Sequence, residues 1–284
     1  VSVLPLLLGL YAFGIGKAAL MPLHRWLPAA MVAPTPVSAL LHAVAVVKAG
    51  VFTMLKIGIY IFGIDFLAES GASQWLIWLA AISIILASIF ALMQNNLKKR
   101  LAYSTVSQLS YITLAMALAT PMAAMGGGMH IAMHAFGKIA LFMCAGAIYV
   151  VTKKTEVSEL SGLGRKMPIT FVIFAIASFS IIGLPPFGGS WSKFLLILGA
   201  FDTGYVSIII VLMISSLLNV AYLLPIVGRG FFAEPKDGSD LRSINEAPLL
   251  CWLPAAIAAG ICLLLFFYAG LIQDFLLPFT EGLK

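Results

Sequence analysis

The chain has 284 residues, of which 62% are hydrophobic and only 10% are charged, and its mean hydropathy is +1.06. A soluble domain carries about 25% charged residues, so the composition excludes a soluble protein and predicts an all-α, polytopic membrane helix bundle. The net charge of +6 at pH 7 therefore reports on membrane topology and does not indicate a nucleic-acid partner.

Eight apolar segments are long enough to cross a membrane as helices, because a hydrocarbon core about 30 Å thick needs about 20 helical residues. The segments are roughly 1–20, 36–64, 75–93, 101–119, 126–152, 167–201, 205–228 and 248–273. The sixth is too long for one straight helix and contains Gly183-Leu-Pro-Pro186. Since proline removes a backbone donor and clashes with the preceding turn, we predict a broken helix there. The second segment is expected to be tilted or interrupted as well.

The basic residues between these segments predict the orientation of the chain. Three basic loops are separated by two crossings each: 94–100, 153–166 and 229–247. Together with Arg25, which is expected on the same side, they hold eleven Lys and Arg residues, whereas the opposite loops hold none. Because Lys and Arg concentrate in loops on the cytoplasmic or matrix side, we predict a multi-pass protein of the bacterial plasma (inner) membrane with these loops in the cytoplasm.

Five lysines lie inside the apolar segments: Lys17, Lys48, Lys56, Lys138 and Lys193. No Asp or Glu lies in the middle of any of these segments. A charged side chain at the bilayer centre costs about 2.5–3.5 kcal/mol on insertion scales, and such groups usually mark an ion or proton path. We therefore interpret the set as functional, except that for Lys56, nearer the outer end of its helix, a structural role is equally expected.

The fifth segment carries a row of titratable side chains. His130, His134 and Lys138 follow one another at intervals of four residues, which places them on one face of a helix. Histidine titrates near neutral pH, so the row suits proton relay. A metal site on the HxxxH spacing and hydrogen-bonded packing histidines are the alternatives. We expect no metal, because no third acidic or cysteine ligand lies in a neighbouring segment and the lysine would repel a divalent ion.

The second segment has a polar stripe of its own, formed by Thr35, Ser38 and His42. Lys48 lies deeper in the segment and about 120° around an ideal helix from His42. The two side chains therefore need a local break or a bridging water to communicate.

Two of the lysines lie close to expected helix breaks, Lys17 five residues before Pro22 and Lys193 seven residues after Pro186. Backbone released from a helix at such a break can line a wet cavity. Further hydroxyl and amide side chains are candidates either for holding water or for interhelical hydrogen bonds: Ser190, Ser192, Ser215, Ser216, Asn219 and Tyr222.

The chain has no Gly-rich phosphate loop, no nucleophile elbow, no haem or iron–sulfur ligand set and no soluble domain for a nucleotide. We therefore expect no cofactor and no direct use of ATP or NADH. The energy is expected from an ion gradient or a partner, which favours a transporter subunit over an enzyme.

Four runs carry a resemblance to a known family: 17–31, 33–51, 96–111 and 183–189. They include Ala33-Pro-Thr-Pro-Val-Ser-Ala-Leu-Leu-His42 and Gly183-Leu-Pro-Pro-Phe-Gly-Gly189. The runs resemble the antiporter-like subunits shared by respiratory complex I, membrane-bound hydrogenases and Mrp-type multisubunit cation/proton antiporters, over most of residues 11–230.

The resemblance implies a pair of inverted five-helix repeats, each with a broken helix that bears a central lysine. By position, Lys17 matches the first central lysine and Lys193 the second, while Lys48 and the His130, His134 and Lys138 row match the connecting relay. It implies three regions: the end of the first repeat (1–64), the second repeat (75–230) and an additional helix (248–273). It also implies a Glu partner for Lys17 on an earlier helix, so we expect the chain to continue a longer polypeptide.

We therefore expect a proton-translocating subunit of a multisubunit Na⁺/H⁺ antiporter, with the wording of residues 42–48 most similar to the D subunit of the Mrp type. Protons would pass from Lys17 through Lys48, His130, His134 and Lys138 towards Lys193. The main alternative is a proton-pumping subunit of complex I (NADH:quinone oxidoreductase) or a membrane-bound hydrogenase. A membrane metalloenzyme and a scaffold with buried cations are further alternatives. The expected partners are other membrane subunits, H⁺ with Na⁺ or K⁺, and the lipid bilayer.

Overall fold

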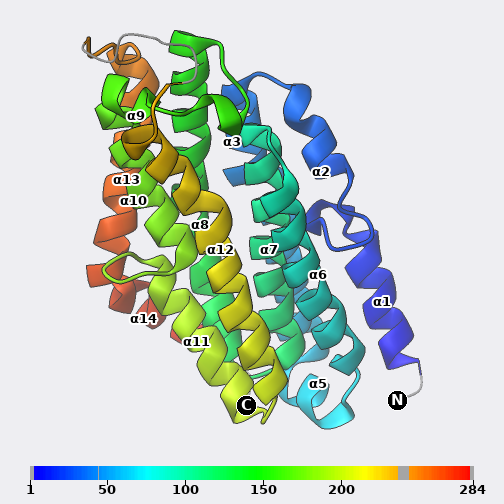
Figure 1. Ribbon diagram of the computed structural model, residues 1–284. Helices are drawn as coiled ribbons and strands as arrows, with labels where there is room; N and C mark the ends of the chain where they lie inside the picture. Colours follow the sequence, from blue (N-terminus) through cyan, green and yellow to red (C-terminus); the bar gives the residue numbers. More distant parts are fainter. Residues whose placement is uncertain (1–2, 44, 236–242, 282–284) are drawn as a thin grey trace.

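The computed structural model describes residues 3–43, 45–235 and 243–281. Within these ranges nearly every residue is helical, no strand is present, and one isolated β-bridge joins Asn96 to Glu156. The helices lie side by side with their long axes roughly aligned (Figure 1). The all-α prediction is confirmed.

Five stretches of helix in the described chain are long and apolar enough to cross a membrane. They are Thr35–Phe62 (α3 Thr35–Ala43, α4 Val46–Lys56 and η3 Ile57–Phe62), α6 Gln74–Met93, α8 Pro121–Thr152, α12 Val206–Phe232 and α13 Leu249–Phe267. Helix α7, Leu97–Leu118, matches the fourth predicted segment but is more polar, because its buried faces carry Ser, Thr and Gln. The first and sixth predicted segments are interrupted, so each contains only shorter helices.

The predicted break in the sixth segment is present. Helix α10, Pro168–Ile182, ends at Gly183 with φ of 91°, and α11, Gly189–Asp202, begins six residues later. A Cβ atom on Gly189 would lie 1.9 Å from the carbonyl oxygen of Ser180, so only glycine permits the two helices to approach this closely. The second segment is interrupted between α3 and α4, where residue 44 lies outside the described residues.

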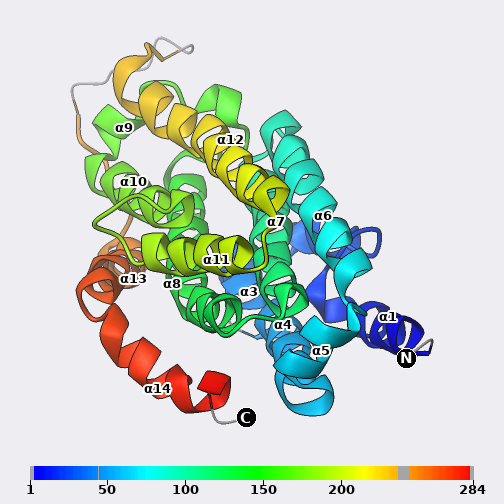
Figure 2. The ribbon, with the colours of Figure 1, turned by 90° about the horizontal axis from the view of Figure 1, so that it is seen from below.

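Helix α8 lies at the centre of the bundle. Figure 2, which looks along the bundle, shows α3, α7, α10, α11 and α13 around it, and all five pack against it. A Cβ atom on Gly126 of α8 would lie 3.0 Å from backbone atoms of α11, so this glycine brings α11 close. Neighbouring helices therefore shield the side chains of α8 on nearly every side. The predicted row of His130, His134 and Lys138 lies on this helix.

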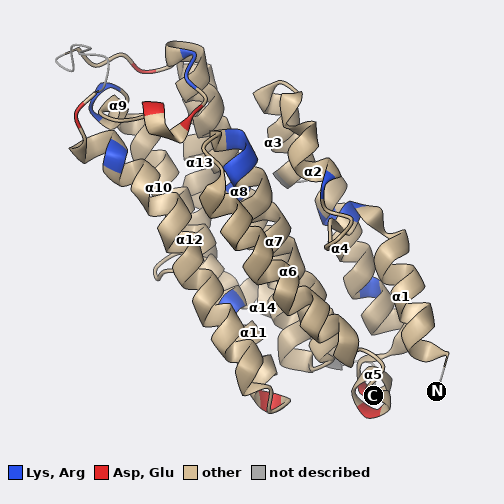
Figure 3. Ribbon diagram, turned by 45° about the vertical axis from the view of Figure 1, so that its right-hand side comes forward, with Lys and Arg blue, Asp and Glu red and all other residues tan. Residues whose placement is uncertain are grey.

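The three basic loops lie together at one end of the bundle, as the alternation of loops predicts. Backbone hydrogen bonds join them: Leu97 N to Thr155 O at 2.9 Å, Gly162 N to Arg229 O at 3.0 Å and Asn245 N to Lys166 O at 2.9 Å. Figure 3 shows Lys and Arg together with some acidic residues at this end, whereas α5 and the end of α11 carry acidic residues at the opposite end. Lys236 and Arg242 of the third loop lie outside the described residues.

The remaining elements are short or peripheral. They are α1 Leu4–Gly14, η1 Gly16–Ala18, α2 Trp26–Ala29, η2 Ala30–Val32, α5 Ile64–Ser70, η4 Val157–Glu159, α9 Leu163–Lys166 and α14 Ala269–Glu281. Helix α1 and η1 together form the interrupted first segment, and α14 packs against the side of α8.

Candidate functional site

Helix α8 presents His130, His134 and Lys138 on one buried face, as their spacing predicts. Their side chains are 2%, 1% and 0% exposed. The two imidazole rings are stacked, with centroids 5.7 Å apart and planes inclined by 24°. Two imidazoles and an ammonium group therefore form a continuous line inside the bundle.

Lys48 joins this line from α4. Its Nζ atom lies 2.5 Å from Nδ1 of His134, and its side chain is only 5% exposed. Helix α4 begins at Val46, after the break that follows α3. The direction of the Lys48 side chain is therefore not fixed by the helical repeat that places the polar stripe on α3. The predicted break therefore directs Lys48 to α8 and not to His42.

His42 approaches the row at a different place. Its buried ring lies against Phe142, with centroids 4.8 Å apart, and Phe142 follows Lys138 by one turn of α8. Neither ring nitrogen of His42 has a hydrogen-bond partner within the described chain. The stripe on α3 therefore reaches the Lys138 end of the row.

Lys138 is held by polar atoms of α7. Its Nζ atom donates to the carbonyl oxygen of Leu101 at 3.1 Å and to Oγ of Ser104 at 2.7 Å. Tyr222 of α12 donates to the same Ser104 oxygen at 3.0 Å, and it is also hydrogen-bonded to Asn219. An ammonium group has three donors and no acceptor, so these neutral oxygens can accept the hydrogen bonds that the charged form of Lys138 offers.

Lys193 is placed by the break between α10 and α11. Its Nζ atom donates to the carbonyl oxygen of Ile182 at 2.9 Å and to Oγ of Ser216 at 3.4 Å. Ile182 is the last residue of α10, and the carbonyl groups at a helix C-terminus carry partial negative charge. The C-terminus of α10 therefore places partial negative charge beside Lys193, which is only 6% exposed.

Tyr111 and Ser192 connect Lys193 to the row. The ammonium group of Lys193 lies 5.2 Å from the centroid of the Tyr111 ring, which stacks on His130 with centroids 5.6 Å apart. Ser192, the residue before Lys193, has its Oγ atom 2.9 Å from Nδ1 of His130. Lys193 therefore meets the row at its His130 end.

These contacts follow a different order from the one expected from the sequence. The expected order entered from Lys48 at His130 and left from Lys138 towards Lys193. In the structure Lys48 contacts His134 in the middle of the row, and Lys193 approaches His130. Lys138 forms the opposite end, one helical turn before Phe142, on whose ring His42 packs. The order is different because the position along α8 at which each neighbouring helix packs does not follow from the order of the helices in the sequence.

Two of the five predicted lysines lie outside the buried row. Lys17 is on η1 at the expected helix interruption, but its side chain is exposed in the described chain. Gly50 of α4 packs on its backbone, since a Cβ there would lie 2.5 Å from the carbonyl carbon of Lys17. Lys56 is exposed, and its Nζ atom lies 5.7 and 5.9 Å from the ring centroids of Phe52 and Tyr60. These contacts support a structural role for Lys56.

Sequence reasoning missed Ser104 and Tyr111, which contact the two ends of the row. Both lie on α7, seven residues apart and therefore on one face of the helix. The signal was the unusual content of Ser, Thr and Gln in a segment that crosses the bundle. Among the described residues, no group of three or more His, Cys, Asp or Glu side chains is arranged so that it could hold a metal ion.

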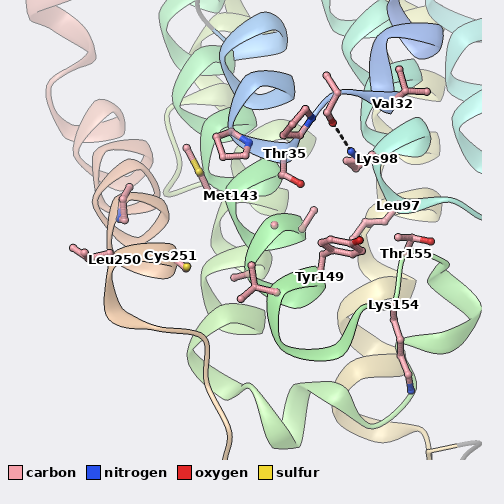
Figure 4. Close-up of a pocket in the computed structure, with 18 residues that line it drawn as sticks. Val32, Thr35, Leu97, Lys98, Met143, Tyr149, Lys154, Thr155, Leu250 and Cys251 are labelled. Carbon is pink, nitrogen blue, oxygen red and sulfur yellow. Dashed lines mark hydrogen bonds between the residues drawn. The ribbon is translucent and has the colours of Figure 1, made fainter.

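Two cavities flank the row. One of about 720 Å³ opens at the basic end, and Figure 4 shows Thr35 of α3, Tyr149 of α8 and Leu250 of α13 lining it. Lys98 lies at its edge and donates to the carbonyl oxygen of Ala33 at 2.8 Å. The other, of about 700 Å³, lies at the α10–α11 break and is lined by Lys193 and by apolar side chains of α11 and α12.

Comparisons with known proteins give one family. A profile described as NADH:quinone oxidoreductase/Mrp antiporter, transmembrane, matches residues 2–219. The probable A/B subunit of a K⁺/H⁺ antiporter from Rhizobium meliloti is 37% identical over 248 residues, which are 85% of this chain and 24% of that protein. The N subunit of the NADH-quinone oxidoreductase from Desulforudis audaxviator is 37% identical over 234 residues, 80% of this chain and 45% of that protein.

The fold has a solved counterpart in the Mrp complex of Dietzia sp., with a TM-score of 0.86 and 24% sequence identity. The similarity covers 97% of this chain and 59% of that one, and at this identity it establishes the fold alone. The chain thus spans less than two thirds of the length of these proteins.

Proposed function

The chain belongs to the NADH:quinone oxidoreductase/Mrp antiporter transmembrane family, and we propose that it carries protons through the membrane for a multisubunit monovalent cation/proton antiporter. The path consists of His42, Lys138, His134, His130 and Lys193, with Lys48 as a branch at His134. Other membrane subunits complete the transporter. The assignment as a D subunit of the Mrp type, which residues 42–48 suggest, stays a prediction.

The observation that carries the proposal is a line of buried titratable groups between two cavities. Thr35 lines the cavity at the basic end, and Ser38 and His42 follow it on one face of α3. From His42 the line continues along α8 to His130, and Lys193 leads from there to the second cavity. A row of ionisable side chains is costly inside a membrane, and such groups usually mark an ion or proton path.

The chemistry of these groups suits proton transfer in steps. Imidazole accepts a proton at one ring nitrogen and releases one from the other, while a lysine holds or releases a single proton. The contact between Lys48 and His134 is short enough for direct exchange. A positive charge on one group opposes protonation of the next, so neighbouring groups titrate together and the charge advances along the row.

We propose that the basic loops face the cytoplasm of a bacterial plasma membrane, on the strength of the Lys and Arg bias. The exchanged cation is then Na⁺ or K⁺, and the similarity to a probable K⁺/H⁺ antiporter protein supports K⁺ as one candidate. Lys17, exposed at the first helix break, is proposed to connect to the row through Lys48, because Gly50 of the same helix packs on the backbone of Lys17.

A second candidate function is proton pumping in a redox-driven complex. The similarity to an N subunit of NADH-quinone oxidoreductase is as high as that to the antiporter protein, 37% identity in both cases. The same path serves either role, because only the source of energy differs.

The test uses the full-length protein with its partner subunits in sealed vesicles that contain a pH-sensitive dye. For an antiporter, a Na⁺ or K⁺ gradient alone drives proton movement, and the His134→Ala variant slows it. For a redox-driven pump, only the addition of NADH and a quinone drives proton movement. Proton movement at the wild-type rate in His134→Ala would overturn the path itself. Lys56→Ala is the matched control, since this lysine is exposed and lies outside the path.

A further inference from the structure

Gln108 of α7 has a buried side chain without a partner. It is 0% exposed, and neither Oε1 nor Nε2 of its amide has a hydrogen-bond partner within the described chain. A primary amide has two donors and an acceptor with two lone pairs, and buried polar groups are rarely left unpaired. The side chain therefore requires a partner that direct contacts with the protein do not supply.

The packing of α7 against α8 places Gln108 beside His134. Ser104 binds Lys138 and Tyr111 stacks on His130, so the two helices run antiparallel along the row. Gln108 follows Ser104 by four residues, and His134 precedes Lys138 by four. Since residues four apart share a helix face, the amide lies on the face of α7 that meets α8, at the height of His134.

His134 has one engaged and one unpaired ring nitrogen. Its Nδ1 atom contacts Lys48, whereas Nε2 is buried without a hydrogen-bond partner in the described chain. When Lys48 is charged it only donates, so Nδ1 then accepts from it and the proton of the neutral ring lies on Nε2. This N–H group then needs an acceptor, and Gln108 has an unused carbonyl oxygen at the same height.

We propose that Gln108 is a positioning residue for His134, and that its side-chain amide, through one bridging water, accepts the hydrogen bond from Nε2 and fixes the ring tautomer that faces Lys48. A buried water with several polar partners is a regular part of protein interiors. The amide also donates, so it can hold the ring when the proton has moved to Nδ1. This inference rests on the proposed proton path, in which His134 is a relay group.

The test measures the tautomer of His134 directly. The full-length protein with its partner subunits is labelled with ring-¹⁵N histidine, and the His134 signals are assigned by their loss in a His134→Asn variant. In the wild type the ¹⁵N shifts are expected to report a protonated Nε2. Gln108→Leu removes both polar atoms at similar size, so a mixture of tautomers and a proton-transfer rate lower by about tenfold are expected.

Two variants separate positioning from packing. Gln108→Glu retains acceptor oxygens, so the protonated Nε2 signal is expected to persist. Thr113→Val is the matched control: Thr113 is also on α7, 1% exposed and without a hydrogen-bond partner in the described chain, and valine has the same shape. It should leave both the tautomer and the rate unchanged.

Wild-type tautomer signals in Gln108→Leu would overturn the proposal, as would an equal change in Thr113→Val. The tautomer measurement needs no transport. If His134→Ala transports normally while Gln108→Leu still changes the tautomer, the proposed path fails and the positioning role stands.

Discussion

The Nζ atom of Lys48 lies 2.5 Å from Nδ1 of His134, although the two residues are 86 positions apart in the sequence. The contact joins α4, in the interrupted second segment, to the long central helix α8. It makes Lys48 a branch on the row and not its first member. Transport that begins near Lys17 therefore has to enter the row in its middle, through a lysine on the helix that packs against the backbone of Lys17.

Lys48 should contribute to transport as a group that releases its proton at His134. We expect both Lys48→Ala and Lys48→Arg to slow ion-driven proton movement, because arginine keeps the charge but does not deprotonate in proteins. Dye-loaded vesicles with the assembled, full-length complex measure the rate. Lys56→Arg is the control. Normal transport by Lys48→Arg would mean that Lys48 contributes only its charge.

Lys193→Ala should abolish proton movement and leave assembly intact. The side chain is held at the end of α10 by Ile182 and Ser216, next to the second cavity, and no other cation of the row reaches this point in the described chain. Transport in vesicles and the elution volume of the complex together check the prediction. A normal rate in this variant would remove Lys193 from the path.

His130 and His134 should act as serial steps of one relay. Each single alanine variant is expected to slow transport, and the double variant should be little worse than the poorer single, because steps in series are not additive. Their stacked rings, 5.7 Å apart, are the structural reason. Strict additivity of the two effects, or stoichiometric zinc in the purified wild-type protein, would contradict the relay and favour separate or metal-binding roles.

Gly189→Ala should destabilise the protein and displace Lys193. The added methyl would lie 1.9 Å from the carbonyl oxygen of Ser180, so α10 and α11 must move apart, at a cost of about 3 kcal/mol, the upper part of the range for overpacking. Thermal unfolding in detergent measures the loss. Gly260→Ala is the matched control, because a Cβ there meets no atom within 4 Å. Equal melting temperatures for the two variants would show that the α10–α11 contact adapts without strain.

Several parts of the site could be predicted because they depend on local chemistry. The face shared by His130, His134 and Lys138 follows from the helical repeat, and the break at Gly183-Leu-Pro-Pro186 follows from the missing proline donor. The roles of Ser104, Tyr111 and Gln108 could not be predicted in this way. Each is an ordinary residue of a polar helix, and only the packing of α7 on α8 brings it to the row.

The sequence by itself determined the membrane setting, the apolar crossings, the basic end and the two helix interruptions, because hydropathy, charge bias and the geometry of proline act over a few neighbouring residues. Only the tertiary structure decided which lysines are buried and in what order the row connects. Lys17 and Lys56 lie in apolar segments as Lys48 and Lys193 do, yet the first two are exposed and the last two buried. The physical reason is that burial and contact depend on which face of a helix meets a neighbour, and side chains far apart in the sequence meet only when helices pack.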